Sequence, residues 1–275
     1  MKFCFVFSVL FACFSAEANQ SMRSPSPSPA DSAGYYTSFD GIKIYFEQHG
    51  QGRPVLLIHG FTGTGDSWKR SALYQDLLNQ GFRVIIVDLR GNGKSDKPHT
   101  DTAYAHDAEA HDLMGLAGFL GISHYMVVGY SRGSIITARL VVLDKRITKA
   151  VMGGIGLDFS NPEWPRRIMF YKALRGDSIP ELAPMIKRIQ AEGLDQQALA
   201  MQQKEQPSTS IAELSNIRIP VLIICGTQDS DNGSASDLAK VIPAASMEKV
   251  PGDHGSTSKT QAFSDHVIAF LQKAN

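Results

Sequence analysis

Short apolar runs alternate with segments of helical spacing over most of this 275-residue chain. The runs consist largely of Val, Ile and Leu, which is typical of strands that are covered on both faces. Successive strands joined through a helix lie parallel, because the helix carries the chain back to the edge where the first strand began. The sequence therefore predicts an α/β fold with a mostly parallel central sheet and helices on both faces. The runs that carry this prediction read PVLLIHG, FRVIIVDLRG, YMVVG, KAVMGG and IPVLIICG.

The alternation breaks once, over residues 157–216, where prolines interrupt short helical fragments. A chain of this length can form one large domain with an insertion or two small domains. Because strands of the same kind flank the break, we expect one domain over residues 34–275. The break is then a helical cap inserted at about 157–216, above the sheet.

The N-terminus has the order of a secretory signal peptide: a lysine, an apolar stretch and the small-residue site AEA. Residues 1–18 are expected to be removed after Ala18, so that the protein is secreted or periplasmic. A retained anchor helix is an alternative, although the stretch is shorter than the roughly 20 residues that a span needs. A lipid anchor at Cys13 is another, since LFAC resembles a bacterial lipobox. Residues 19–33 are rich in Ser and Pro and are expected to form an extended linker.

The overall charge is balanced, with 27 Lys and Arg residues against 27 Asp and Glu residues. Nucleic acids and anionic lipids require a basic patch, so the predicted partner is a small molecule and not nucleic acid. Cys225 is the one cysteine beyond the predicted signal peptide, and it lies in an apolar strand, where an inert core thiol is expected. These features leave the oligomeric state open.

The pentapeptide Gly129-Tyr130-Ser131-Arg132-Gly133 lies between a predicted strand and a predicted helix. This G-x-S-x-G context is that of a nucleophile elbow, in which a tight turn exposes the serine oxygen. The helix start places N–H groups and the positive end of the dipole beside Ser131. A helix N-cap is the structural alternative for this serine.

A serine nucleophile needs a base, and the base needs a carboxylate that fixes its orientation. The sequence offers His254 in VPGDHGS, after the last predicted strand, and Asp229 in ICGTQDS, after the strand before it. The order Ser131, Asp229, His254 is that of α/β-hydrolase triads. The competing carboxylates are Asp158, Asp231 and Asp253, of which Asp253 adjoins the base too closely to face its ring.

Acyl transfer also needs N–H donors for the oxyanion. The glycine-rich loop in LLIHGFTGTG follows a buried strand, so the backbone N–H groups of Phe61 and Arg132 are expected to form the oxyanion hole. His59 precedes this loop and is expected to hold it by hydrogen bonding rather than to act as a base.

Four motifs in this order resemble those of the α/β-hydrolase superfamily: HGFTG, DLRGNGKSDKP, VVGYSRG, and CGTQD with GDHG. The resemblance covers nearly all of the chain after the predicted signal peptide and implies the α/β-hydrolase fold. It implies a supporting role for Asp88 and Ser95 in the second motif. The chain departs from its relatives at Arg132 and Ser134, where an apolar residue and a glycine are common, and Arg132 could place a charge near the pocket.

The predicted cap carries aromatic side chains, Trp164, Phe170 and Tyr171, that either line a substrate pocket or pack the cap itself. Its apolar surface favours a small or medium acyl or alcohol group over a long chain. Arg166, Arg167 or Arg132 could recruit a carboxylate of the substrate, with solvent-facing positions as the alternative for the arginines of the cap.

Together these residues predict an exported serine hydrolase that cleaves carboxylic esters through an acyl-enzyme intermediate. The elbow serine disfavours epoxide hydrolase and haloalkane dehalogenase chemistry, which uses aspartate there. Carbon–carbon bond hydrolase, thioesterase and aminopeptidase activity share the triad and stay open, as does a ligand-binding relative without turnover. No metal or organic cofactor is expected: His106 and His111 lie five residues apart and lack the spacing of a helical metal pair.

Overall fold

The computed structural model describes residue 1 and residues 31–274. The predicted signal peptide after Met1, the alternative anchor at Cys13 and residues 19–30 of the predicted linker therefore lie outside the described residues.

An eight-stranded sheet forms the centre of the described chain, in the order β1-β2-β4-β3-β5-β6-β7-β8. β1 and β2 pair antiparallel, as do β2 and β4, whereas all the other neighbours pair parallel. The predicted mostly parallel sheet is thereby confirmed. The strands are β1 (Ser32–Thr37), β2 (Lys43–His49), β3 (Pro54–Ile58), β4 (Arg83–Val87), β5 (Tyr125–Tyr130), β6 (Ile147–Gly153), β7 (Val221–Gly226) and β8 (Ala245–Val250).

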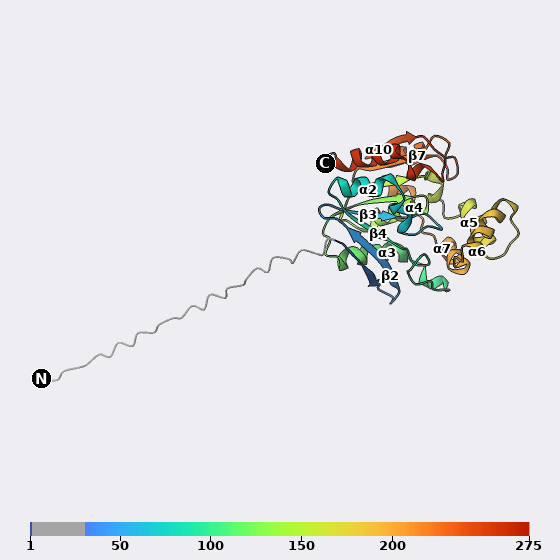
Figure 1. Cartoon of the computed structure of the whole chain (residues 1–275), viewed down its shortest axis with the longest axis horizontal. Coiled ribbons are helices and arrows are strands. Elements are labelled where there is room, and N and C mark those ends of the chain that lie inside the picture. The colour runs from blue at the N-terminus through green and yellow to red at the C-terminus, as the bar shows by residue number, and fades with distance from the viewer. Residues whose placement is uncertain (2–30, 275) are drawn as a thin grey trace.

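Helices cover both faces of this sheet (Figure 1). α2 and α10 pack together on one face, and α3 and α4 pack together on the other. The α-helices are α1 (Asp66–Lys69), α2 (Ala72–Asn79), α3 (Ala108–Phe119), α4 (Arg132–Leu143), α5 (Pro165–Leu174), α6 (Ala183–Ala191), α7 (Gln196–Lys204), α8 (Ile211–Ser215), α9 (Ala235–Val241) and α10 (Gln261–Gln272). Single-turn 3-10 segments lie at Asp101–Ala103, Leu157–Ser160, Pro180–Leu182 and Thr257–Lys259.

The core lies on both sides of the central strands. Every residue of β5 and of β7 is buried, as expected of strands with helices on both faces. Each buried Val, Leu or Ile side chain contributes about 1.5–3 kcal/mol relative to an exposed one, so the central strands form a rigid platform. Their carboxyl ends all point to one edge, because β3, β5, β6, β7 and β8 run parallel.

The cap consists of α5, α6 and α7, which lie together at one end of the molecule (Figure 1). Leu174, Ile189 and Leu199 form a small apolar core of its own. Polar contacts join α7 and its N-cap to the body of the protein: Lys204 forms an ion pair with Asp101, and His99 Nε2 lies 2.8 Å from an oxygen of the N-cap Asp195.

Three boundaries differ from the sequence prediction. Ser32 and Ala33 belong to β1 and pair with β2, so the domain starts before residue 34. The cap is narrower than residues 157–216, because α8 packs against α4 and α9 and thus on the body. The segment DSWKRSALYQDLLNQG has helical spacing that predicts one helix over residues 66–81, but it forms two helices, since Ser71 caps α2 by accepting a hydrogen bond from Tyr74 N–H.

Among the described residues, no helix combines the length and the apolar character that crossing a membrane requires.

Candidate active site

Ser131 occupies the sharp turn between β5 and α4, with φ 55° and ψ −124°. A non-glycine residue at positive φ is strained, and the surrounding structure must hold it there. The two glycines of the motif allow close packing: a Cβ on Gly129 would lie 2.3 Å from the carbonyl oxygen of Gly133, and one on Gly133 would lie 2.2 Å from that of Ile58. The Ser131 N–H also donates to the Gly153 carbonyl over 2.8 Å. The turn is therefore fixed by both neighbouring strands.

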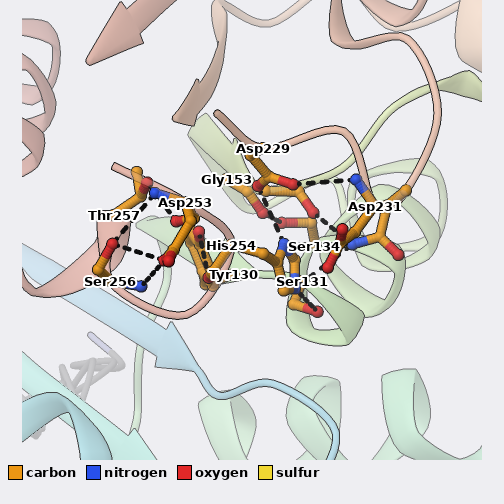
Figure 2. A network of polar contacts seen from close by, with 12 residues as sticks. Tyr130, Ser131, Ser134, Gly153, Asp229, Asp231, Asp253, His254, Ser256 and Thr257 are labelled. Carbon is orange, nitrogen blue, oxygen red and sulfur yellow. Dashed lines mark hydrogen bonds and ion pairs between the residues drawn. The ribbon is translucent and has the colours of Figure 1, made fainter. Parts of the chain in front are cut away.

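His254 lies between Ser131 and Asp229 (Figure 2). Its Nε2 is 2.9 Å from Ser131 Oγ, and its Nδ1 is 2.9 Å from Asp229 Oδ2. Asp229 and His254 come from the loops after β7 and β8, which end at the same edge of the sheet as β5. The three side chains predicted from sequence thus form one hydrogen-bonded chain, with the carboxylate almost fully buried and the imidazole partly exposed.

The competing carboxylates lie elsewhere. The backbone N–H of Asp231 donates to Asp229 Oδ1 over 3.3 Å, while its own carboxylate is half exposed. Asp253 accepts hydrogen bonds from the N–H and hydroxyl of Ser256, beside the base but turned away from it (Figure 2). Asp158 is exposed. Asp229 is the carboxylate that orients His254.

The loop after β3 approaches the elbow at Gly60, whose added Cβ would lie 3.4 Å from Ser131 Cβ. Within residues 31–274, the backbone N–H groups of Phe61 and Arg132 have no hydrogen-bond acceptor. The N–H of Arg132 is the first of α4, where the helix dipole adds positive potential. Two free donors beside the serine are suited to a developing oxyanion.

Several buried side chains hold this loop in place. The ring of His59 is neutral: its Nε2 accepts from Leu89 N–H over 3.1 Å and its Nδ1 donates to Gly60 O over 2.7 Å, and burial lowers the pKa of His59. Asp88 accepts from the N–H of Gly65 over 2.7 Å. The Asn92 amide donates to the carbonyls of Phe61 and Gly63 at 2.9 and 3.1 Å.

Ser95 also has a supporting position, because its hydroxyl donates to the Asp88 carbonyl and accepts from Tyr45 N–H. Ser134 donates to the Gly153 carbonyl over 2.7 Å and is buried inside α4, so this departure from the motif of the relatives leaves the elbow intact.

The Arg132 side chain does not bring a free charge to the pocket. Its guanidinium forms two hydrogen bonds with Glu109, at 2.8 and 2.5 Å, and a third to the Gln202 carbonyl of the cap over 3.3 Å. Both charged side chains are only 3% exposed. The charge expected near the pocket is therefore neutralised by a buried ion pair that the sequence did not indicate.

Two neighbours of His254 were not singled out from the sequence. The Tyr130 hydroxyl donates to the His254 carbonyl over 2.9 Å, and the two rings lie 5.5 Å apart. The Asn232 Nδ2 lies 3.3 Å from His254 Nδ1 and donates to the Gly154 carbonyl over 3.1 Å. The position of Tyr130 next to Ser131 in the elbow motif could have marked it as a site residue, whereas no local sequence pattern marks Asn232.

A cavity of about 390 Å³ opens above Ser131, between the strand ends and the cap. Its apolar wall includes Phe61 from the loop after β3 and Trp164, Phe170 and Met185 from the cap segment. Tyr171 is a correction to the prediction: it packs in the apolar cluster of the cap and is not among the described residues that line the cavity.

Few side chains of the described residues could bind a metal. Asp229, Asp231 and His254 are the one set of three or more His, Cys, Asp or Glu residues there whose ligand atoms all lie within 4.8 Å of one another, and two of them already form the hydrogen-bonded chain with Ser131. His106 and His111 are both exposed. Cys225 is buried, and burial raises the pKa of its thiol, so it is a core residue.

A mostly parallel sheet with an elbow serine, a histidine and an aspartate at its strand ends, under a cap inserted between β6 and β7, defines the class of α/β hydrolases. Residues 53–184 match the family described as the alpha/beta hydrolase fold. The chain belongs to the α/β-hydrolase superfamily, as its sequence motifs predicted.

Solved proteins with related folds are named for several different activities. A solved bromoperoxidase from Bacillus anthracis is 25% identical, with a TM-score of 0.69, over 88% of this chain and all (100%) of that one. A solved esterase from Exiguobacterium antarcticum is 20% identical, also with a TM-score of 0.69, over 88% of this chain and 100% of its own.

Among sequence relatives, a Synechocystis sp. protein assigned as a non-heme chloroperoxidase is 29% identical over 267 residues, 84% of this chain and 95% of that protein. An epoxide hydrolase from Siraitia grosvenorii is 40% identical over 97 residues, but these cover only 35% of this chain and 30% of that protein.

Proposed function

We propose that this protein is a serine hydrolase that cleaves carboxylic esters of small or medium size through an acyl-enzyme intermediate. The observation that carries the proposal is the chain Ser131 Oγ, His254, Asp229, with both contacts at 2.9 Å, beside the free N–H groups of Phe61 and Arg132.

In the first half of the reaction, Ser131 Oγ attacks the ester carbonyl carbon and His254 Nε2 takes the hydroxyl proton. The carbonyl oxygen becomes an oxyanion that accepts hydrogen bonds from the Phe61 and Arg132 N–H groups. The bond to the alkoxy oxygen then breaks, and His254 gives its proton to the leaving alcohol. Asp229 stabilises the imidazolium that forms between these two proton transfers.

In the second half, water attacks the acyl carbon while His254 takes one of its protons. The tetrahedral intermediate collapses, the bond to Ser131 Oγ breaks, and His254 returns the proton to that oxygen. The products are the carboxylic acid and the free enzyme.

The residue at the elbow favours ester cleavage over the reaction named for the epoxide hydrolase relatives, because position 131 holds a serine rather than a carboxylate. The named esterase among the structural relatives supports acyl transfer on this fold. The cavity of about 390 Å³ supports a substrate of limited size, since pockets for small ligands begin at roughly 300 Å³.

Covalent labelling with a fluorophosphonate, together with turnover of ethyl esters of increasing acyl length, tests the proposal. We expect labelling of the wild-type protein and loss of both labelling and turnover in Ser131→Ala. Ser258→Ala is the matched control, because this serine also lines the cavity but has no place in the proton relay. A labelled protein that cleaves only thioesters, amides or carbon–carbon bonds would keep the nucleophile and overturn the ester substrate. An unlabelled protein would be a ligand-binding relative.

We also propose export to the periplasm or medium, supported by the lysine, apolar stretch and AEA site at the N-terminus. Mass spectrometry of the mature protein tests this. A chain starting at Asn19 supports removal of residues 1–18, whereas a diacylglyceryl group on Cys13 identifies a lipid-anchored enzyme.

A further inference from the structure

The cavity above Ser131 is lined by basic side chains from the cap and the loop after β8: Arg166, Arg167, Arg188 and Lys259. Among the described residues that line it, none is an aspartate or a glutamate. Arg132 also lines it, but its charge is neutralised by Glu109. The cavity therefore carries a net positive charge, although the chain as a whole is balanced.

Arg166 is the residue of this set that is best placed to bind an anion. Its Nε donates to Asn232 Oδ1 over 3.1 Å, and its guanidinium carbon lies 4.9 Å from the centre of the Phe170 ring. These contacts fix the side chain while its Nη groups stay available. The nearest carboxylate oxygen, on Asp231, is 4.0 Å away and belongs to a side chain that is 50% exposed, so the pair is weak.

The other two arginines are less suited to this role. The guanidinium of Arg167 already donates to the backbone carbonyls of Pro162, Gln203 and Lys204. Arg188 is exposed and donates to Thr62 Oγ1 over 3.0 Å.

Asn232 links Arg166 to the reacting groups. The amide oxygen accepts from Arg166, and the amide nitrogen donates to Gly154 O and lies 3.3 Å from His254 Nδ1. Only this orientation of the amide satisfies both partners, because a flipped amide would set its NH₂ against the Arg166 N–H and its oxygen against a carbonyl. The guanidinium is thus held one side chain away from the base.

We propose that Arg166 binds a carboxylate of the substrate, so that the preferred esters carry a carboxylate a few bonds from the scissile carbonyl. A guanidinium presents paired N–H groups that match the two oxygens of a carboxylate, and the partly desolvated position strengthens the contact. Its side chain is 33% exposed. This inference rests on the proposed ester hydrolase function and adds the substrate class.

Two pairs of esters that differ only in charge test the inference. The first pair, monoethyl glutarate and ethyl 4-carbamoylbutanoate, places the charge on the acyl side. The second, 4-acetoxybutanoate and 4-acetoxybutanamide, places it on the alcohol side. We expect the wild-type protein to prefer the carboxylate in at least one pair. The ratio of kcat/KM for the carboxylate to kcat/KM for the carboxamide should fall roughly 10- to 100-fold in Arg166→Gln and partly recover in Arg166→Lys.

Arg175→Gln is the matched control. It removes the same charge from the C-cap of the same helix, α5, but Arg175 is exposed, lies over Tyr171 and does not line the cavity. The carboxylate-to-carboxamide ratio should stay at the wild-type value in this variant. An equal drop in Arg166→Gln and Arg175→Gln would reduce the effect to long-range charge and overturn a specific site.

A binding measurement separates this inference from the proposed function. Ser131→Ala protein is titrated calorimetrically with each member of both pairs, with and without Arg166→Gln. Tighter binding of the carboxylate member, lost when Arg166 is replaced, supports the anion site whether or not the wild-type protein cleaves esters. If the wild-type protein cleaved no ester, that result would overturn the proposed ester hydrolysis alone. Equal binding of carboxylate and carboxamide in both pairs overturns the anion site while leaving ester hydrolysis intact.

Discussion

Replacing Glu109 by glutamine should destabilise the protein strongly, because it leaves the buried Arg132 guanidinium without its counter-charge. Both side chains are 3% exposed and are joined by hydrogen bonds of 2.8 and 2.5 Å, and the remaining partner of Arg132 is the carbonyl of Gln202 at 3.3 Å. Breaking a buried pair on one side costs about 3–5 kcal/mol. For a domain of this size, that corresponds to a fall in Tm of roughly 6–20 °C.

Urea unfolding followed by circular dichroism measures this free energy. The exposed pair of Lys240 with Asp237 offers the control, and Lys240→Gln should change the free energy of unfolding by less than about 1 kcal/mol. The double variant Glu109→Leu with Arg132→Met should recover much of the loss, since an apolar pair of similar size needs no counter-charge. If Glu109→Gln unfolds within about 1 kcal/mol of the wild type, the argument that this pair is desolvated is wrong.

The remaining predictions concern the acid, the elbow and acid stability. Asp229→Asn should lower kcat by several orders of magnitude through loss of imidazole orientation, whereas Asp231→Asn should have a mild effect; steady-state kinetics giving the opposite ranking would move the acid. Gly133→Ala should reduce the yield of folded protein, because its Cβ would lie 2.2 Å from a carbonyl oxygen at the end of β3; a folded variant with wild-type Tm would contradict this. Burial raises the pKa of Glu47, but hydrogen bonds, first that from Lys69, outweigh burial and lower it to about 2. The ionised Glu47 carboxylate then contributes its full stabilisation of the folded protein above about pH 4.5, and this contribution is lost as the pH falls toward 2. The free energy of unfolding of Glu47→Gln should decline less steeply with falling pH across this range than that of the wild type. An unchanged slope would exclude the ion pair as the cause of the decline.

The sheet and the three residues at its edge were accessible from the sequence because each depends on local signals. Uninterrupted apolar runs indicate strands covered on both faces, and glycines around Ser131 indicate a turn too tight for side chains. The carboxyl ends of parallel strands meet at one edge, so Asp229 and His254 could be expected near Ser131 without knowledge of the intervening loops. The structure brings the three together as expected, and their catalytic roles remain the proposal.

Contacts between distant segments could not be predicted in this way. The partner of Arg132 lies on α3, and the hydrogen bonds of Asn232 depend on how the loop after β7 folds against β6 and β8. Tyr171 and Phe170 are adjacent in the sequence of α5, yet only Phe170 lines the cavity, because the direction of each side chain depends on how the helix packs. Sequence composition cannot decide between two neighbouring aromatic residues of this kind.

The attachment of α7 restricts how ligands can enter and leave the site. Gln202 Nε2 donates to Arg90 O and to Asn92 Oδ1, both at 2.5 Å, and the backbone carbonyl of Gln202 accepts from the Arg132 guanidinium. Lifting α7 would break these buried hydrogen bonds and leave Asn92, whose amide supports the loop carrying Phe61, without its partner on α7. We therefore expect exchange of substrate and product to proceed past α6, where Arg188 is exposed, while α7 stays in place. Access is then controlled by side-chain movement at one rim rather than by a hinged opening of the whole cap.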